Sequence, residues 1–536
     1  MKICIAQINS VVGDLQHNYS LISKAAKKAL DENVSLLITP ELSLTGYPPE
    51  DLLLNNNFLM EVNEKLLLLA KENPKIMIIV GHPLLEGEKL FNAASVIYKG
   101  KVFKKYKKQI LPNYGVFDEK RYFVPGNSSL IFNYKKLTVG VLICEDIWSK
   151  LPIENLIKNN VDLIVCINAS PYEIDKNNHR MKNIQRKIKG SNSKVVYVNT
   201  VGGQDDLLFD GGSFILDPNI GLVLSLPQFK ITNKIVELNS LNKNEVKDSL
   251  GSINILFDGL VLALKDYLQK NSIQKVFLGL SGGIDSAVVL CIAAKACSKK
   301  DIQTIMMPTK FTSKISLDDA KTLAKNIGVK YTIKRIDSLN NKINKMFEKD
   351  FLGYEADTTE ENIQARIRGL LLMTYANKFK GVVLATSNKS ETAVGYATLY
   401  GDMVGGFSVL KDVPKTWVYK LAQFINENEI IIPTRIITRA PSAELKDNQS
   451  DQDSLPDYEI LDGIIDLYLD KGHCPATIIK KGYDAFTVKK VVKLIHGSEF
   501  KRRQSAPGPK VTNKAFGKER RYPITNNFRI TTKGNS

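Results

Sequence analysis

The segment Ser281–Ser286, with the sequence SGGIDS, has the residue types of a phosphate-binding loop. It follows the apolar run 275–280 and precedes an apolar segment of helical character, 287–297. Two glycines let backbone N–H groups approach an anion closely, and the start of a helix adds unpaired donors and the positive end of its dipole. The spacing differs from that of GxxxxGK[ST], so no lysine spans the β and γ phosphates. The segment predicts a phosphate site that serves a reaction other than γ-phosphoryl transfer. An ordinary strand–turn–helix connection is the alternative.

Three reactive side chains precede this segment, and they follow strand-like runs or lie in turn-rich stretches: Glu41, Lys108 and Cys144. Cys144 follows the apolar run 137–143, and we expect this position to expose its thiol. A neutral thiol needs a nearby base or positive field to become a good nucleophile.

A carboxylate is the candidate base for this thiol, because none of the five histidines lies in an obvious cysteine protease context. Glu41 directly follows the strand-like run 36–40 and is placed for that role. Lys108 can supply the cation that stabilises a tetrahedral oxyanion. Each residue also has a structural interpretation, since a cysteine at a strand end is usually a core residue and a lysine in a lysine-rich run is usually solvated.

The length and composition indicate a folded protein with more than one domain. A chain of 536 residues exceeds what one hydrophobic core usually spans, and 43% of it is apolar. The six cysteines form no CxxC pair, which argues against a disulfide framework and a zinc cluster and favours a reducing cytoplasm. Neither a signal peptide nor an apolar stretch of membrane-spanning length is evident.

A net charge of +18 raises the question of nucleic acid binding, and the stretch 501–521 is rich in lysine and arginine. Elsewhere the lysines are dispersed and accompany abundant asparagine and isoleucine. We therefore expect no nucleic acid partner, because an anionic small substrate explains a local basic cluster equally well.

Two α/β domains are predicted from the order of the elements. Roughly the first 230 residues alternate short β-branched runs with helical patterns and tight turns, as in an α/β layered domain. The chain turns polar around 233–252, and we place a linker at 241–252 between domains 1–240 and 253–536. The second domain again alternates strands and helices, which predicts a mostly parallel sheet that binds ligands at the carboxyl ends of its strands.

Three N-terminal segments carry a family resemblance: 39–49 (TPELSLTGYPP), 111–119 (LPNYGVFDE) and 143–148 (ICEDIW). They resemble the nitrilase-type glutaminase domain of bacterial glutamine-dependent NAD⁺ synthetases, and the resemblance extends over essentially the whole chain. It implies an α-β-β-α sandwich for the first domain.

This resemblance implies a catalytic triad with Glu41 as general acid and base, Lys108 as oxyanion stabiliser and Cys144 as nucleophile. Lys107 is the neighbouring alternative to Lys108, which we prefer because the family places its lysine three residues before the leucine of the Leu-Pro pair. The residues implied to hold glutamine or support the triad are Tyr114, Glu119, Ser170 and Lys176.

The C-terminal part resembles the synthetase domain of the ATP-pyrophosphatase superfamily. Its matching segments are SGGIDS, 386–391 (TSNKSE), 400–402 (YGD) and 451–456 (DQDSLP). The resemblance implies a Rossmann-like, doubly wound parallel sheet.

The resemblance also implies three sets of ligand contacts in this domain. ATP is expected at Gly279, Leu280, Ser281, Gly282, Gly283, Ile284, Asp285, Ser286 and Thr386. Mg²⁺ is expected at Asp285 and Glu391, and deamido-NAD⁺ at Asn362, Glu391 and Lys510. Taken alone, Glu391 is interpreted as a residue that complements a helix dipole, and Lys510 as part of a solvated basic tail.

The implied activity couples two reactions. Glutamine is hydrolysed to glutamate and ammonia, and the ammonia amidates deamido-NAD⁺ through an adenylate while ATP becomes AMP and pyrophosphate. The resemblance further implies an enclosed route for ammonia and a homo-oligomer, commonly an octamer.

Two other functions are considered. In one, an independent amidase is joined to an amidotransferase that acts on another acid. In the other, a nitrilase-like module binds glutamine without turnover and serves as a scaffold. The presence of Glu41, Lys108 and Cys144 disfavours the scaffold, and the resemblance in 501–504 and 520–524 disfavours another acid substrate.

Overall fold

The structure is a computed structural model that describes residues 1–240, 252–446, 449–526 and 528. The chain forms two compact units, Met1–Ile255 (unit 1) and Leu256–Ser536 (unit 2). Of the expected linker 241–252, only Ser252 falls among the described residues, and it begins helix α5. The position of the linker stays a prediction.

Unit 1 contains two six-stranded sheets and a two-stranded hairpin, β10–β11. The first sheet has the order β14 (Thr232–Glu237), β1 (Lys2–Gln7), β2 (Leu36–Ile38), β3 (Met77–Glu86), β4 (Lys89–Tyr98) and β5 (Lys101–Lys107). The second has the order β13 (Gly221–Ser225), β12 (Phe214–Asp217), β9 (Lys194–Asn199), β8 (Leu163–Asn168), β7 (Leu137–Ile143) and β6 (Leu130–Tyr134). The hairpin strands are Val201–Gln204 and Leu207–Asp210.

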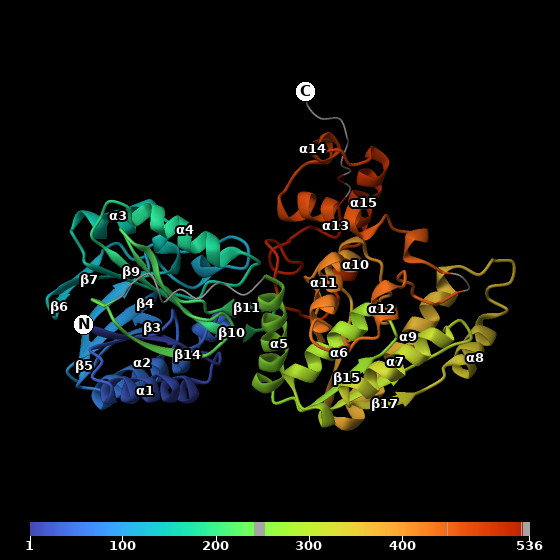
Figure 1. The fold of residues 1–536 in the computed structure, drawn as a ribbon, viewed down its shortest axis with the longest axis horizontal. Helices are drawn as coiled ribbons and strands as arrows, with labels where there is room; N and C mark the ends of the chain where they lie inside the picture. The colour runs from blue at the N-terminus through green and yellow to red at the C-terminus, as the bar shows by residue number, and fades with distance from the viewer. Residues whose placement is uncertain (241–251, 447–448, 527, 529–536) are drawn as a thin grey trace. The chain divides into compact units, whose positions relative to one another are not determined.

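Helices cover the outer face of each sheet in unit 1 (Figure 1). They are α1 (Leu15–Asp31), α2 (Asn56–Glu72), α3 (Lys150–Lys158) and α4 (Lys176–Ile188). The N-termini of α1 and α2 are capped by Asp14 and Asn55, whose side chains accept backbone N–H groups of the first turn.

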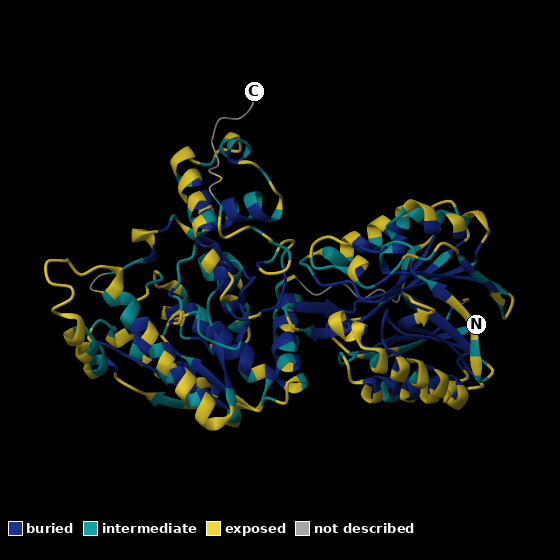
Figure 2. Ribbon diagram, turned by 180° about the vertical axis from the view of Figure 1, so that it is seen from behind, coloured by how far each residue is buried: buried dark blue, intermediate teal, exposed yellow. Residues whose placement is uncertain are grey.

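The side chains of β1 alternate between the two apolar layers on either side of its sheet. Ile3 and Ile5 join the core between the two sheets, whereas Cys4 and Ala6 point to the other face and pack with residues of α1 and α2. A strand buried on both faces has an almost continuous apolar sequence. Figure 2 shows the strands buried and the outward faces of the helices exposed. The predicted α-β-β-α sandwich is confirmed.

The polar stretch that starts near residue 233 is in part a strand. Residues 232–237 form β14, which pairs antiparallel with β1 at one edge of its sheet. An edge strand has one neighbour and is often polar, so composition alone did not distinguish it from a linker.

Unit 2 is built on a five-stranded parallel sheet. Its order is β17 (Lys330–Ile333), β16 (Ile302–Met306), β15 (Lys275–Gly279), β18 (Gly381–Ala385) and β19 (Phe407–Ser408). The chain runs outward from β15 to β17 and then returns to the other side of β15. This reversal makes the carboxyl ends of β15 and β18 a topological switch point, the usual ligand site of such sheets. The predicted doubly wound parallel sheet is confirmed.

The helices of unit 2 include long ones around the sheet and a C-terminal group, α13–α15, whose apolar core also includes residues of α10 (Figure 1). Their bounds are α5 (Ser252–Lys270), α6 (Ile284–Ala296), α7 (Lys314–Ile327), α8 (Asp337–Phe347), α9 (Thr358–Phe379), α10 (Lys389–Val394), α11 (Lys415–Ile425), α12 (Thr434–Thr438), α13 (Tyr458–Ile465), α14 (Pro475–Lys480), α15 (Ala485–Gly497) and α16 (Glu499–Arg502). Within the part of the chain that the structure describes, no helix has both the length and the apolar character to cross a bilayer.

Candidate active sites

Cys144 lies where β7 ends and a short 3₁₀ turn, Cys144–Ile147, begins. Its backbone φ is +46°, a left-handed conformation that costs a non-glycine residue free energy and often marks a functional turn. The expected exposure of this thiol is wrong, because Cys144 is only 3% exposed. Burial and the nearby Glu41 raise the pKa of the thiol well above its usual value, while the charge of Lys108 lowers it. The resting thiol is therefore protonated and needs a base.

Glu41 follows β2, and three donors fix its buried carboxylate. Oε2 accepts the backbone N–H of Ala169 at 2.8 Å. Oε1 accepts Asn92 Nδ2 at 2.8 Å and Lys108 Nζ at 2.7 Å. These bonds hold the carboxylate in one orientation in the interior of unit 1.

Lys108 bridges two carboxylates, with Nζ 2.7 Å from Glu41 Oε1 and 2.8 Å from Glu119 Oε1. Its side chain has no exposed surface. Burial alone lowers the pKa of Lys108, but the charges of Glu119 and Glu41 raise it well above the usual value. The neighbouring Lys107 instead pairs at the surface with Glu86 at 2.6 Å. The structure thus brings Lys108, not Lys107, to Glu41.

Glu119 is the second carboxyl group of this cluster, and it also accepts the hydroxyl of Tyr47 at 2.9 Å. Burial raises the pKa of Glu119 to about 7, with Lys108 opposing the rise and Glu41 adding to it. One ammonium cannot balance two buried carboxylates, so Glu119 takes up a proton close to neutral pH.

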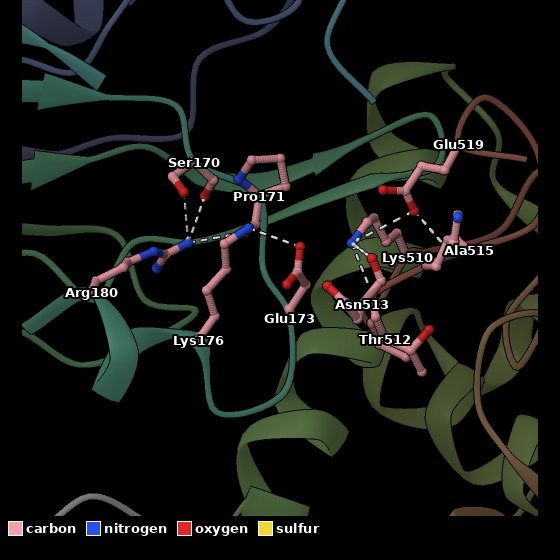
Figure 3. Close-up of polar contacts among 12 residues, drawn as sticks. Ser170, Pro171, Glu173, Lys176, Arg180, Lys510, Thr512, Asn513, Ala515 and Glu519 are labelled. Carbon is pink, nitrogen blue, oxygen red and sulfur yellow. Dashed lines mark hydrogen bonds and ion pairs between the residues drawn. The ribbon is translucent and has the colours of Figure 1, made fainter. Parts of the chain in front are cut away.

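The other residues expected to hold glutamine lie on segments beside this cluster. Ser170 follows Ala169, and its carbonyl and hydroxyl oxygens accept Arg180 Nη2 at 3.0 and 3.1 Å (Figure 3). Lys176 begins α4 and pairs with Glu173 at 2.9 Å. Tyr114 is 59% exposed, and its hydroxyl donates to Glu145 Oε2 at 2.9 Å.

Unit 2 contains a cavity of about 290 Å³ at the switch point of its sheet. Residues 279–286, Thr386 and Glu391 all lie in its wall. Helix α6 begins at Ile284, three residues before the expected helical segment, so Asp285 and Ser286 stand in its first turn. Gly282 has φ +83°, and a Cβ atom there would lie 2.6 Å from the carbonyl oxygen of Ser316. Only glycine fits this turn without a shift of α7.

Asp285 and Glu391 meet at Lys415, the first residue of α11. Lys415 Nζ contacts Asp285 Oδ2 and lies 3.2 Å from Glu391 Oε1. Asn388 caps α10 by accepting the N–H of Glu391 and donates to Asp285 Oδ1 at 2.9 Å. Burial raises the pKa of Glu391 to about 8; Lys415 opposes this rise, whereas Asp285 and Asp451 add to it.

This cluster has more acidic than basic groups, because Lys415 contacts Asp285 and Glu391 and a third carboxyl group, Asp451, lies close enough for its charge to act on both Lys415 and Glu391. Among the described residues no group of three or more histidine, cysteine or acidic side chains is arranged to hold a metal by itself. Asp285 and Glu391 nevertheless fit Mg²⁺, which commonly takes one or two protein carboxylates and completes its coordination with substrate phosphates and water.

Asn362 and Lys510 are not among the described residues that line the cavity. Asn362 Oδ1 accepts the hydroxyl of Thr398 at 2.6 Å. Figure 3 shows Lys510 directed toward its own loop, where Nζ donates to the carbonyl oxygens of Thr512 and Asn513 at 2.8 and 3.3 Å. Their contact with deamido-NAD⁺ stays a prediction.

Four residues that contact the carboxylates of these clusters were not predicted as site residues. Asn92 and Tyr47 touch the carboxylates of unit 1, and Asn388 and Lys415 touch those of unit 2. Asn388 lies within the TSNKSE segment, which was a usable signal. Lys415 had none, because one lysine among many gives no sign of being buried.

Two family models match the chain. The Carbon-nitrogen hydrolase model matches residues 2–242, and the NAD synthase model matches residues 256–505. The glutamine-dependent NAD(+) synthetase of Acinetobacter baylyi is 46% identical over 536 aligned residues, which cover 98% of this chain and 99% of the relative. The chain belongs to the glutamine-dependent NAD(+) synthetase family. The synthetase of the same name from Aquifex aeolicus is 40% identical and covers 98% of this chain and 100% of its own length.

Solved synthetase structures agree with this assignment. The glutamine-dependent NAD⁺ synthetase of Acinetobacter baumannii, solved in complex with ADP, has 42% identity and a TM-score of 0.80, with 98% of each chain covered. The synthetase of Cytophaga hutchinsonii has a TM-score of 0.86 over 98% of each chain, and at 22% identity it supports the fold. The predicted ligase function with glutamine as amido donor is confirmed at the level of the synthetase family, which disfavours both alternatives.

Proposed function

We propose that this synthetase hydrolyses glutamine at Cys144 in unit 1 and amidates deamido-NAD⁺ in the cavity of unit 2. One observation carries the proposal: a single chain holds a buried Glu41–Lys108–Glu119 cluster beside a cysteine and a glycine-rich loop at the switch point of a parallel sheet. The boundaries 1–240, 241–252 and 253–536 belong to the proposal.

In unit 1, Cys144 Sγ attacks the amide carbon of glutamine while Glu41 accepts the thiol proton. The raised pKa of Cys144 favours this concerted transfer over a preformed thiolate. An ammonium has three donors; two of those on Lys108 go to carboxylates, and we assign the third to the oxyanion.

Glu41 then donates its proton to the departing nitrogen, and ammonia leaves a glutamyl thioester. Water, activated by Glu41, attacks this thioester, and glutamate departs as Cys144 recovers its proton. Tyr114, Ser170 and Lys176 would hold the amino acid part of glutamine, and Glu119 would keep Lys108 in place.

In unit 2, the carboxylate of deamido-NAD⁺ attacks the α-phosphorus of ATP, and pyrophosphate leaves. Ammonia attacks the resulting acyl adenylate, AMP departs and the amide remains. Residues 279–286 and Thr386 would bind ATP, because glycine backbone and the first turn of α6 supply N–H donors. The Acinetobacter baumannii synthetase was solved in complex with ADP, which supports nucleotide binding by this chain.

Asp285 and Glu391 would hold Mg²⁺, which when bound neutralises charge that develops on the departing pyrophosphate. Lys415 would contribute a fixed positive charge beside the same carboxylates. We assign Asn362, Glu391 and Lys510 to deamido-NAD⁺. For Lys510, this role requires that its ammonium exchange the carbonyl oxygens of its own loop for the substrate.

The proposal also includes the transfer of ammonia, the oligomeric state and the cellular location of the enzyme. Ammonia is mostly ammonium at neutral pH, which is no nucleophile, so we expect an enclosed transfer route. The family resemblance implies a homo-oligomer, commonly an octamer, and we include it in the proposal. All six cysteines are unpaired in the structure, which agrees with a cytoplasmic location. We expect no nucleic acid partner.

The decisive experiment compares two nitrogen sources in the Cys144→Ala variant. Glutamine-supported NAD⁺ formation should be abolished, and ammonium-supported formation should survive. Retained glutamine-dependent synthesis would refute Cys144 as nucleophile.

A product assay on the parent enzyme tests the second reaction. Purified protein with ATP, Mg²⁺ and deamido-NAD⁺ should release AMP and pyrophosphate with either glutamine or ammonium. Release of ADP would overturn the adenylate mechanism.

A further inference from the structure

Asp146 is a buried carboxylate that the mechanism above leaves without a role. It lies two residues after Cys144, in the same 3₁₀ turn, and has no exposed surface. We propose that Asp146 is a positioning residue that holds the oxyanion lysine, Lys108, at a fixed place relative to the nucleophile Cys144.

One oxygen of this carboxylate binds the segment that carries Lys108. Asp146 Oδ1 accepts the backbone N–H of Gln109 at 3.0 Å and that of Ile110 at 2.8 Å. These residues directly follow Lys108, at the point where the chain has left β5. Two adjacent N–H groups on one oxygen fix the path of the backbone here.

The other oxygen binds the segment that carries Cys144. Asp146 Oδ2 accepts the backbone N–H of Ile143 at 3.1 Å and the hydroxyl of Tyr106 at 2.9 Å. Ile143 is the residue before Cys144, so the bond closes the strained turn in which the nucleophile sits at φ +46°. Tyr106 belongs to β5 and adds a second link to the lysine segment.

The side chain of Asp146 thus joins two segments that are far apart in sequence. Ile110 and Asp146, which are linked by one of these hydrogen bonds, are 36 positions apart. The backbone of Lys108 makes a further hydrogen bond: its N–H donates to the carbonyl oxygen of Asn92 at 2.9 Å. That bond ties Lys108 to β4, whereas Asp146 ties the same segment to the nucleophile. Neutral donors fill both oxygens of Asp146, so its role is to set geometry.

The inference rests on the proposed roles of Cys144 and Lys108, and it predicts a particular kinetic signature. A lysine displaced by about 1 Å from the oxyanion lowers turnover by about 100-fold, because the transition state is affected more than substrate binding. Loss of Asp146 should therefore lower kcat for glutamine hydrolysis and leave KM nearly unchanged.

The test uses the full-length enzyme with Asp146→Asn and Asp146→Ala. An asparagine keeps the shape but has one accepting oxygen for four donors, so we expect a loss in kcat of about 100-fold, and a larger loss for alanine. The matched control is Asp217→Asn, since Asp217 is also buried and accepts two backbone N–H groups, of Asn219 and Ile220, in the turn after β12. It should hydrolyse glutamine at the parent rate.

Titration with a glutamine-like alkylating reagent, measured on the Cys144 peptide because the other five cysteines are also unpaired and Cys474 is exposed, counts competent sites, so that kcat is given per site and misfolding is separated from mispositioning. The proposal is supported by a kcat loss per titrated site with unchanged KM and unchanged ammonium-supported synthesis. A parent-like kcat per site in Asp146→Asn, or a loss that is mainly a rise in KM, overturns it. If Cys144 of the parent enzyme is not alkylated and Cys144→Ala stays active, the proposed nucleophile has failed instead.

Discussion

Lys108 in unit 1 and Lys415 in unit 2 are each held between two carboxylates, and these two clusters differ in their access to water. In unit 1, the side chains of Lys108, Glu41 and Glu119 are 0%, 0% and 5% exposed. In unit 2, Lys415 is 2% exposed, but Asp285 and Glu391 are 17% and 16% exposed and line the cavity. The sealed cluster suits proton transfer between fixed groups. The open one keeps negative charge where a cation and phosphates can approach.

Asp285→Ala should give the largest effect, and it tests whether the open cluster acts separately from the sealed one. The change removes a carboxylate from the phosphate loop, so we expect NAD⁺ synthesis to disappear with glutamine and with ammonium. Glutamine hydrolysis should continue, measured as glutamate release. Full ammonium-dependent synthesis in this variant would refute the nucleotide site.

The same substitution in both clusters, Lys108→Met and Lys415→Met, measures the cost of removing each cation. Loss of one partner of a fully buried pair typically destabilises a protein by about 3–5 kcal/mol. We expect such a loss in unit 1 and a smaller one in unit 2, because water can reach Asp285 and Glu391. Amide hydrogen exchange in β4 and in β18 under native conditions measures the two units separately. Equal losses would contradict the comparison.

Protonation of Glu119 should make the stability of unit 1 depend on pH. Its pKa rises from 4.5 to about 7 on folding, so between these values the folded state binds more protons than the unfolded chain. The free energy of unfolding contributed by this group therefore falls as pH rises from about 4.5 to about 7. Glu119→Gln should flatten this slope in urea unfolding of unit 1 monitored by exchange in β4. A slope as steep as in the parent would show that Glu119 does not titrate there.

Lys107→Met should have the smallest effect, and it distinguishes the two adjacent lysines. Lys107 pairs with Glu86 at the surface, where its side chain is 32% exposed. Such pairs contribute about 0–1 kcal/mol, so stability and glutamine turnover should be nearly those of the parent. A loss of turnover comparable to that of Lys108→Met would transfer the oxyanion role to Lys107.

Much of the sheet architecture was predictable because buried strands have a dense apolar signal. The run 137–143 coincides with β7, and the run 275–280 contains β15. The turn between β15 and α6 was predictable for a similar reason, since paired glycines between a strand-like run and a helical run indicate a tight turn. Strands and tight turns of this kind can be predicted because they depend mainly on residues that are neighbours in the sequence.

The rest depended on contacts between segments far apart in sequence. The exposed Cys144 was a wrong expectation because the residues that bury it come from other strands and loops. Lys415 and Asn92 became visible only where α11 and β4 bring them against carboxylates. In β14, polar composition hid a strand that is defined by its pairing with β1.

The close approach of Gly282 to Ser316 has a consequence for how the sequence tolerates change. The phosphate loop rests on the backbone of the first turn of α7, with no side chain between them. A mutation that lengthens, shortens or rotates that turn therefore alters the shape of a loop more than 30 residues earlier in the chain. If residues 279–286 bind ATP as proposed, a substitution that shifts the first turn of α7 should also change nucleotide affinity, so substitutions in the two segments should depend on each other.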